Sequence, residues 1–494
     1  MVLALRGLLR PWPGGGLAPL HRLVAEAPRA LVELAPRRLC LATAPRRLCS
    51  TVTNASRRAR STIAAEIASP RVAVSAASAS AGAVVPREVG WWLVGCSSAV
   101  FGMVVLGGVT RLTRSGLSMT DWRPQGSLPP LNEAEWEAEF AKYKRFPEFQ
   151  RLHPDMDLDD FKSIFWYEWS HRMAGRAIGI IFGVPLLYFS ARGKIPRHLA
   201  PTLGLLFALG GSQGLVGWWM VRSGLQEPPA DLDGVPRVSP YRLASHLTVA
   251  FGIYSMLLYT SLGILQPRWT KPGAAVFPAS RELLASIKPL FRRAHMLAAL
   301  VGVTAISGAF VAGMQAGFAF NTFPLMEGRL IPDGYFELKP AYRNFFESVR
   351  PASATIAAAV AAAAAAASSG LGVISACAAQ VPSVQLHHRA LALSTVGAIG
   401  AFWAYAHRLP LPPAVARTVD VLLLAAIGQV SLGVATVVHA VPVWLGSAHQ
   451  AGALTLFSVT LLLLHTLRVP HAAARAARFA PQVAARSARD AKLP

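Results

Sequence analysis

Four histidines in this chain have the spacing and surroundings to act as paired metal ligands. Each lies toward one end of an apolar stretch about as long as the ~20 residues that a membrane helix needs. They are His171, His246, His388 and His449. Two imidazoles that face each other inside a helix bundle can bind a haem iron from both sides. Zinc would need further nitrogen, sulfur or oxygen ligands, and the cysteines lie elsewhere. A lone membrane histidine more often pairs with a polar neighbour, so the prediction of metal binding depends on all four positions.

The residue three places before the histidine differs between the two pairs. Glu168 precedes His171 on the same helical face, whereas Gln385 stands in that position before His388. A carboxylate next to a haem can take up or deliver protons, whereas an amide cannot titrate. We therefore predict that the first pair is catalytic and that the second supports it or transfers electrons. The alternative for Glu168 is a solvated residue at the membrane boundary.

An arginine directly follows one histidine of each pair, Arg172 after His171 and Arg389 after His388. A guanidinium binds carboxylates well, so both arginines are candidate contacts for haem propionates. Their alternative role is to anchor the helix ends at lipid headgroups. We interpret the remaining histidines of the membrane region and its loops as structural, and they are His153, His198, His295, His387, His407, His439, His465 and His471.

The composition places these residues in a membrane protein. Of 494 residues, 53% are hydrophobic and 15% charged, and the mean hydropathy is +0.40, whereas soluble chains carry about 25% charged residues. The net charge of +23 would suit a nucleic-acid partner. We exclude that partner because much of the basic excess lies in the two terminal segments and the rest in alternate loops. The four cysteines form no CxxC motif, which argues against a disulfide framework or a zinc site.

Residues 1–80 are predicted to be a mitochondrial transit peptide and linker. They are rich in arginine, serine, alanine and leucine, and their acids are Glu26, Glu33 and Glu66. This profile is typical of organelle targeting segments, which do not belong to the fold. A disordered basic tail is the alternative.

Hydropathy predicts eight membrane helices, at 90–110, 171–190, 201–221, 243–265, 295–316, 386–406, 415–437 and 443–467. The loops after the second, fourth and sixth helices are basic, whereas those after the first and third are acidic. By the positive-inside rule, both termini face the mitochondrial matrix and the four histidines lie toward the outer side. We interpret residues 131–165 as one or two short helices outside the membrane.

The two halves of the chain repeat the same markers in the same order. The first and fifth helices end in glycine-containing segments at 106–118 and 311–321. Gln213 and Gly217 in the third helix correspond to Gln429 and Gly433 in the seventh. We therefore predict an all-α polytopic membrane protein, with its eight transmembrane helices arranged as two repeated four-helix bundles. The predicted parts are a catalytic half at 88–265, a matrix linker at 266–292, a second half at 293–467 and a basic matrix tail at 468–494.

Taken together, these motifs resemble the haem A synthases of mitochondria and proteobacteria, over about 88–470 except for one segment. They are GGVTRLT at 107–113, SGLS at 115–118, EWSHR at 168–172, SHL at 245–247, NTFPLM at 321–326, NFFE at 344–347, QLHHR at 385–389 and AHQ at 448–450.

The resemblance implies an enzyme that oxidises the C8 methyl group of haem O to a formyl group, through a geminal diol that loses water. The product, haem A, serves cytochrome c oxidase. By motif, His171 and His246 flank the substrate haem, Glu168 is the acidic active-site residue, and His388 and His449 ligate a haem b cofactor. The implied location is the mitochondrial inner membrane. The implied partners are haem O synthase, cytochrome c oxidase assembly factors, a ferredoxin as electron donor and a further copy of the chain.

The chain departs from the family in two places. It lacks the cysteine pair that some bacterial members carry in the first outer loop. It also has an atypical alanine-rich segment at 350–382, which would invert the topology of the second half if it crossed the membrane. We interpret this segment as an outer-loop insertion or a gene-model artefact, and we predict that deleting it leaves haem A formation intact when the shortened chain is expressed in a synthase-deficient strain.

Two other functions fit part of this pattern. A two-haem cytochrome b that only transfers electrons would share the four histidines, but it would not explain why Glu168 faces a glutamine in the second half. A non-catalytic oxidase assembly factor or transporter would use the histidines for packing or proton relay.

Overall fold

In a computed structural model, the chain is built from helices and has no extended strand within the residues that are described. These residues are 85–227, 236–265, 281–332, 335 and 380–468. Several predicted features lie outside them: the transit peptide, most of the matrix linker, the NFFE motif, nearly all of the alanine-rich segment and the basic tail. Of the four cysteines, the described part of the chain holds Cys96, which is buried and forms no disulfide.

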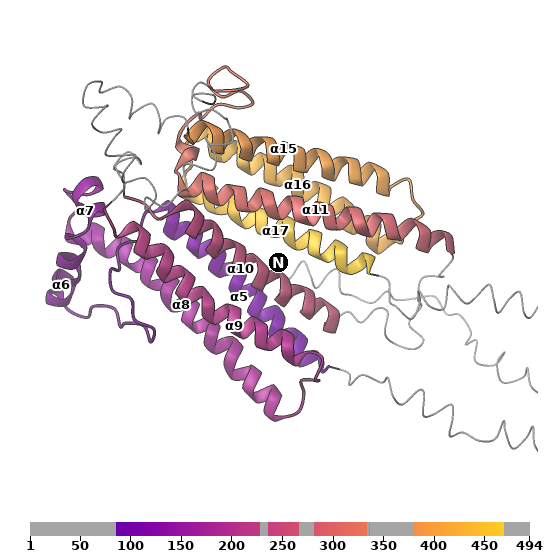
Figure 1. The fold of residues 1–494 in the computed structure, drawn as a ribbon, viewed down its shortest axis with the longest axis horizontal. Helices are drawn as coiled ribbons and strands as arrows, with labels where there is room; N and C mark the ends of the chain where they lie inside the picture. The colour runs from indigo at the N-terminus through magenta and orange to yellow at the C-terminus, as the bar shows by residue number, and fades with distance from the viewer. Residues whose placement is uncertain (1–84, 228–235, 266–280, 333–334, 336–379, 469–494) are drawn as a thin grey trace, which may run out of the picture. The chain divides into compact units, whose positions relative to one another are not determined.

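Four long helices form the first helix group (Figure 1). They are α5 (Arg87–Leu112), α8 (Leu158–Ala191), α9 (Ala200–Gly224) and α10 (Pro240–Leu265). Each helix packs against the next one in the group, and α10 packs back against α5. The four therefore form a closed ring, in which α8 and α10 lie diagonally opposite each other.

The second helix group has the same order of contacts. It consists of α11 (Arg281–Gly313), α15 (Gln380–Ala406), α16 (Pro413–Val438) and α17 (Val443–Leu467). Again each helix packs against the next, and α17 closes the ring against α11. A short 3-10 helix, η1 (Ala316–Phe318), follows α11. The two groups meet where α10 and α17 pack against each other, and where α10 contacts α11 and α17 contacts α5 (Figure 1).

The helices of the described segments support a polytopic membrane protein. Seven are long and apolar enough to cross a membrane, namely α5, α8, α9, α10, α11 from Ile287, α16 and α17. The remaining long helix, α15, has 27 residues but is not among these seven. Its first ten residues include Gln385, His388 and Arg389, which lower its hydropathy.

Helix α8 begins earlier than the sequence indicates. The predicted span starts at 171, but the helix starts at Leu158, where the Asp157 side chain accepts a hydrogen bond from Asp160 N and caps the first turn. The prediction of short outer helices is therefore right for α6 (Glu133–Tyr143) and α7 (Pro147–Leu152) only. Residues 158–165 are the first turns of α8 instead.

The outer turns of α8 support a small aromatic core of their own. Phe161 and Phe165 of α8 pack with Trp136, Phe140 and Tyr143 of α6, all of them buried. The rings of Phe140 and Phe161 stack at 4.9 Å between centroids. This core explains how α8 continues as a helix beyond the apolar span, because α6 covers the aromatic side chains of its first turns.

Glycine and small polar contacts join the two helix groups. At Gly313, the end of α11, a Cβ atom would lie 2.9 Å from Pro240 Cα at the start of α10. Between α10 and α17, the Tyr254 hydroxyl and Ser458 Oγ share a hydrogen bond of 2.6 Å. The junction at Gly313 is backbone against backbone, so it cannot adapt by rotating a side chain.

We predict that Gly313→Ala destabilises the protein, because the added methyl group must push α10 and α11 apart. Overpacking of this kind typically costs about 1–3 kcal/mol of unfolding free energy. The measurement is the thermal unfolding midpoint of the detergent-solubilised protein. Gly400→Ala in α15 is the matched control, since a Cβ there meets nothing within 4 Å. Equal midpoints for the two variants would contradict the proposed tight junction.

Candidate functional site

Each candidate ligand packs against a glycine of a neighbouring helix. The histidines lie on α8, α10, α15 and α17, and the glycines on α5, α9, α11 and α16. The pairs are His171 with Gly107, His246 with Gly217, His388 with Gly308 and His449 with Gly433, and a Cβ on the glycine would lie 3.0, 3.4, 3.3 and 2.9 Å from the imidazole, respectively. The histidine and glycine helices alternate around both rings. A larger residue at any of these glycines would meet the imidazole ring.

The spacing of the second pair fits a single metal ion between the rings. The ring centres of His388 and His449 are 6.5 Å apart, with the ring planes at 89°. An imidazole nitrogen binds a transition metal at about 2.0 Å and lies about 1.1 Å from its own ring centre, so two imidazoles that bind one metal from opposite sides have ring centres about 6.2 Å apart. Within the described ranges, no three His, Cys, Asp or Glu residues converge on a common point. A haem, whose porphyrin supplies four further ligands, therefore fits this donor set better than a bare ion.

The first pair has the same histidine–glycine contacts, but its imidazole rings have fewer hydrogen-bond partners. His171 and His246 lie close enough across the ring of helices for a charge on one imidazole to affect the other. The Gln213 amide donates to the backbone carbonyl of His246 at 3.2 Å, as Gln429 does to His449 at 2.9 Å. Within the described residues, the buried Nδ1 of His246 has no hydrogen-bond partner.

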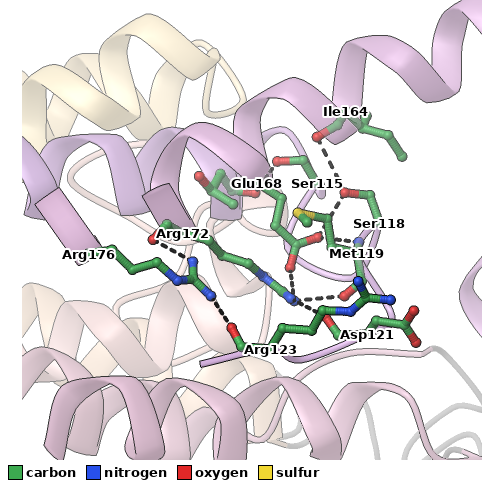
Figure 2. A network of polar contacts seen from close by, with 10 residues as sticks. Ser115, Ser118, Met119, Asp121, Arg123, Ile164, Glu168, Arg172 and Arg176 are labelled. Atoms are coloured by element: carbon green, nitrogen blue, oxygen red, sulfur yellow. Dashed lines mark hydrogen bonds and ion pairs between the residues drawn. The ribbon is translucent and has the colours of Figure 1, made fainter. Parts of the chain in front are cut away.

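Glu168 is buried, with 2% of its surface exposed, so the solvated alternative is wrong. Figure 2 shows its carboxylate among three donors. Oε2 accepts hydrogen bonds from Ser118 Oγ at 2.8 Å and from Met119 N at 2.6 Å, and Oε1 accepts one from Arg172 Nη2 at 2.5 Å. The burial of a carboxylate is costly unless it is paired and hydrogen-bonded, and all these requirements are met here.

Two arginines of α8 attach the segment after α5 to the side of this helix (Figure 2). Arg172 donates to the carbonyls of Met119 and Asp121 at 2.7 and 2.8 Å. Arg176 donates to the carbonyls of Arg123 and Pro124 at 2.5 and 3.1 Å. The Arg172 guanidinium thus binds Glu168 and the main chain. Its contact with a haem propionate remains a prediction.

In the second group, the residues that correspond to Glu168 and Arg172 are Gln385 and Arg389, and both donate hydrogen bonds to the main chain after α11. Gln385 is also buried, and its amide donates to the carbonyls of Ala316 and Ala319 at 3.0 and 2.7 Å. Arg389 donates to the carbonyls of Phe320 and Thr322 at 2.6 and 2.8 Å. Both residues accept a hydrogen bond from the arginine four residues later, Gln385 Oε1 from Arg389 at 3.4 Å, but only the Gln385 amide also donates to the main chain. The glutamine therefore completes a main-chain contact and has no proton to exchange.

Sequence reasoning missed a second buried carboxyl group near the first pair. Glu148 on α7 is 5% exposed, and the Tyr143 hydroxyl donates to its Oε2 at 3.2 Å. The pKa of Glu148 is raised from 4.5 to about 8, chiefly by burial. The charge of Glu168 also raises this pKa, whereas the Tyr143 hydrogen bond and the charges of Arg111 and Arg114 lower it. The acid-rich loop around Glu148 gave no sign that this one carboxyl group is buried against Tyr143.

The raised pKa of Glu148 makes the stability of the protein depend on pH. The folded state holds this proton up to about pH 8, whereas the unfolded chain releases it near pH 4.5. The stabilisation is therefore complete below pH 4.5 and is lost as the pH rises through about 8. We predict that Glu148→Gln unfolds at a higher temperature than the wild type at pH 9, with a smaller difference at pH 5. The exposed Glu137→Gln is the control, and equal pH profiles for all three proteins would refute the prediction.

Comparison with known proteins shows similarity to one protein family over most of the chain. The family model COX15-CtaA, described as cytochrome oxidase assembly protein, matches residues 90–461. A protein named Heme A synthase COX15 from Arabidopsis thaliana is 48% identical over 384 residues, which cover 78% of this chain and 75% of the relative. The Homo sapiens protein of that name is 40% identical, over 77% of this chain and 83% of the relative. A Heme A synthase from Parvibaculum lavamentivorans is 39% identical, over 77% and 94%.

Proposed function

The chain belongs to the COX15-CtaA family of cytochrome oxidase assembly proteins, and we propose that it is a haem A synthase whose first helix group performs the oxidation. The enzyme is an oxidoreductase that converts haem O to haem A for cytochrome c oxidase. The reaction oxidises the C8 methyl group to a formyl group by successive hydroxylations and loss of water.

The buried carboxylate of Glu168 carries the assignment of chemistry to the first group. It lies three residues from His171, within a buried hydrogen-bond network that fixes the position of both carboxylate oxygens. General acid or base catalysis needs a titratable group fixed near the reacting atoms. Gln385 holds the corresponding place near His388 and cannot serve in this way.

In the proposed division, His171 and His246 bind the substrate haem O, and His388 and His449 bind a haem b cofactor. The 6.5 Å ring spacing of the second pair supports a bis-histidine site there. Bound haem b would supply one-electron redox chemistry. Ser118, Met119 N and Arg172 would hold the Glu168 carboxylate, and the arginine would also fix the segment that covers it.

We further propose that eight helices cross the mitochondrial inner membrane as two repeated four-helix bundles, with α15 as the eighth crossing. The closed order of contacts in each helix group supports this arrangement. Both termini would lie in the matrix, where a ferredoxin would deliver electrons. Haem O synthase, oxidase assembly factors and further copies of the chain are the proposed partners.

The division of labour predicts different results from exchanging the two residues. Glu168→Gln should retain bound haem but lower haem A formation by a factor of about 10²–10⁴, the usual contribution of a general acid or base. Gln385→Glu should reduce formation less. Both variants are expressed in a strain without its own synthase, and their haem is extracted and identified.

The low-spin haem spectrum and the unfolding midpoint of each purified variant control for folding. Equal loss of haem A from both changes would refute the division of labour. Bound haem without any haem A formation by the wild type would leave the electron-transfer cytochrome as the better assignment.

A further inference from the structure

A hydroxyl group of α11 contacts one candidate ligand of the second pair. Ser307 Oγ lies 2.7 Å from His388 Nδ1. The same Oγ donates a hydrogen bond to the Thr304 carbonyl at 2.7 Å. A serine hydroxyl has one hydrogen and two lone pairs. Since that hydrogen already points to Thr304, Oγ must accept the hydrogen bond from His388 Nδ1.

This direction of the hydrogen bond fixes the tautomer of His388. A neutral imidazole carries one hydrogen, so protonation at Nδ1 leaves a free lone pair on Nε2. Metal-binding histidines usually donate their second ring N–H to an acceptor, which fixes the tautomer, orients the ring and raises the basicity of the ligand. Ser307 supplies that acceptor from the neighbouring helix.

We propose that Ser307 is the positioning residue for His388, and that its hydrogen bond helps to retain the haem of the second group as a resident cofactor. The proposal rests on the proposed haem function of the second pair.

The first pair has no equivalent device. Ser307 directly precedes Gly308, the glycine that packs against His388, whereas Leu106 directly precedes Gly107, the glycine that packs against His171. Within the described part of the chain, no side chain hydrogen-bonds the His171 ring, and His246 Nδ1 is buried without a partner. A histidine whose ring has no hydrogen-bond partner suits a haem that must leave as product. A histidine whose ring is held by a hydrogen bond, as His388 is by Ser307, suits a haem that must stay.

The test compares Ser307→Ala with the wild-type holoprotein in detergent. Without the acceptor, His388 becomes a weaker and less oriented ligand. We expect haem of the second site to be about 10–100-fold less tightly held, in keeping with other losses of a ligand's hydrogen-bond partner. Haem transfer to apomyoglobin measures retention, and a redox titration should show a higher midpoint potential for that haem. Ser307→Thr, which keeps the hydroxyl, should restore both.

Thr304→Val is the matched control on the same helix. It removes a 2.8 Å hydrogen bond from Thr304 to Thr395, which also joins α11 to α15, without touching a histidine. The proposal fails if Ser307→Ala matches the wild type, or if Thr304→Val shifts retention and potential as much. A wild-type protein without low-spin haem would overturn the proposed function itself, whereas unchanged haem in Ser307→Ala would overturn only the role of the serine.

Discussion

A carboxylate buried among apolar helices must have its charge and its lone pairs satisfied by the protein. At Glu168 a serine, a main-chain N–H and an arginine meet this requirement, and two of the three come from outside the α8 helix. The segment after α5 therefore has to fold back against α8. Arg172 and Arg176 then use their remaining donors on the carbonyls of that segment. The same hydrogen bonds thus fix both the position of the Glu168 carboxylate and the path of the segment after α5.

The two helix groups use one framework for two kinds of site. In both, histidines on alternate helices pack against glycines of the helices between them, which keeps the imidazoles at the centre of the ring. The polar residues around this framework differ. The first group has an acceptor at Glu168 and ligand rings with few partners, and the second has a donor at Gln385 and a serine on its histidine. The two groups thus share their histidine–glycine geometry and differ in the polar residues around it, and the proposed division of labour rests on those differences.

Residue patterns predicted much of this arrangement, and their limits have physical causes. The four histidines and their helices could be located because apolar length and repeated motifs are local features of a chain. The role of Ser118 could not, because its contact with Glu168 spans 50 residues and depends on how one loop folds. The start of α8 was placed too late because hydropathy detects the membrane span, whereas the cap at Asp157 and the cover from α6 extend the helix beyond it. Glu148 was missed for a similar reason: its neighbours in the sequence are also acidic, and they do not indicate which carboxyl group the fold buries.

The length of α8 has a mechanical consequence. Its 34 residues extend for about 51 Å at 1.5 Å per residue, and the hydrocarbon core of a bilayer is only about 30 Å thick. The first turns, docked to α6, and the following turns, which carry His171, are therefore parts of one continuous rod. A displacement of α6, by a protein or a lipid surface outside the membrane, would act on this rod as on a lever and move His171 relative to α10. A contact on α6 can in this way reach the first histidine pair through a single helix.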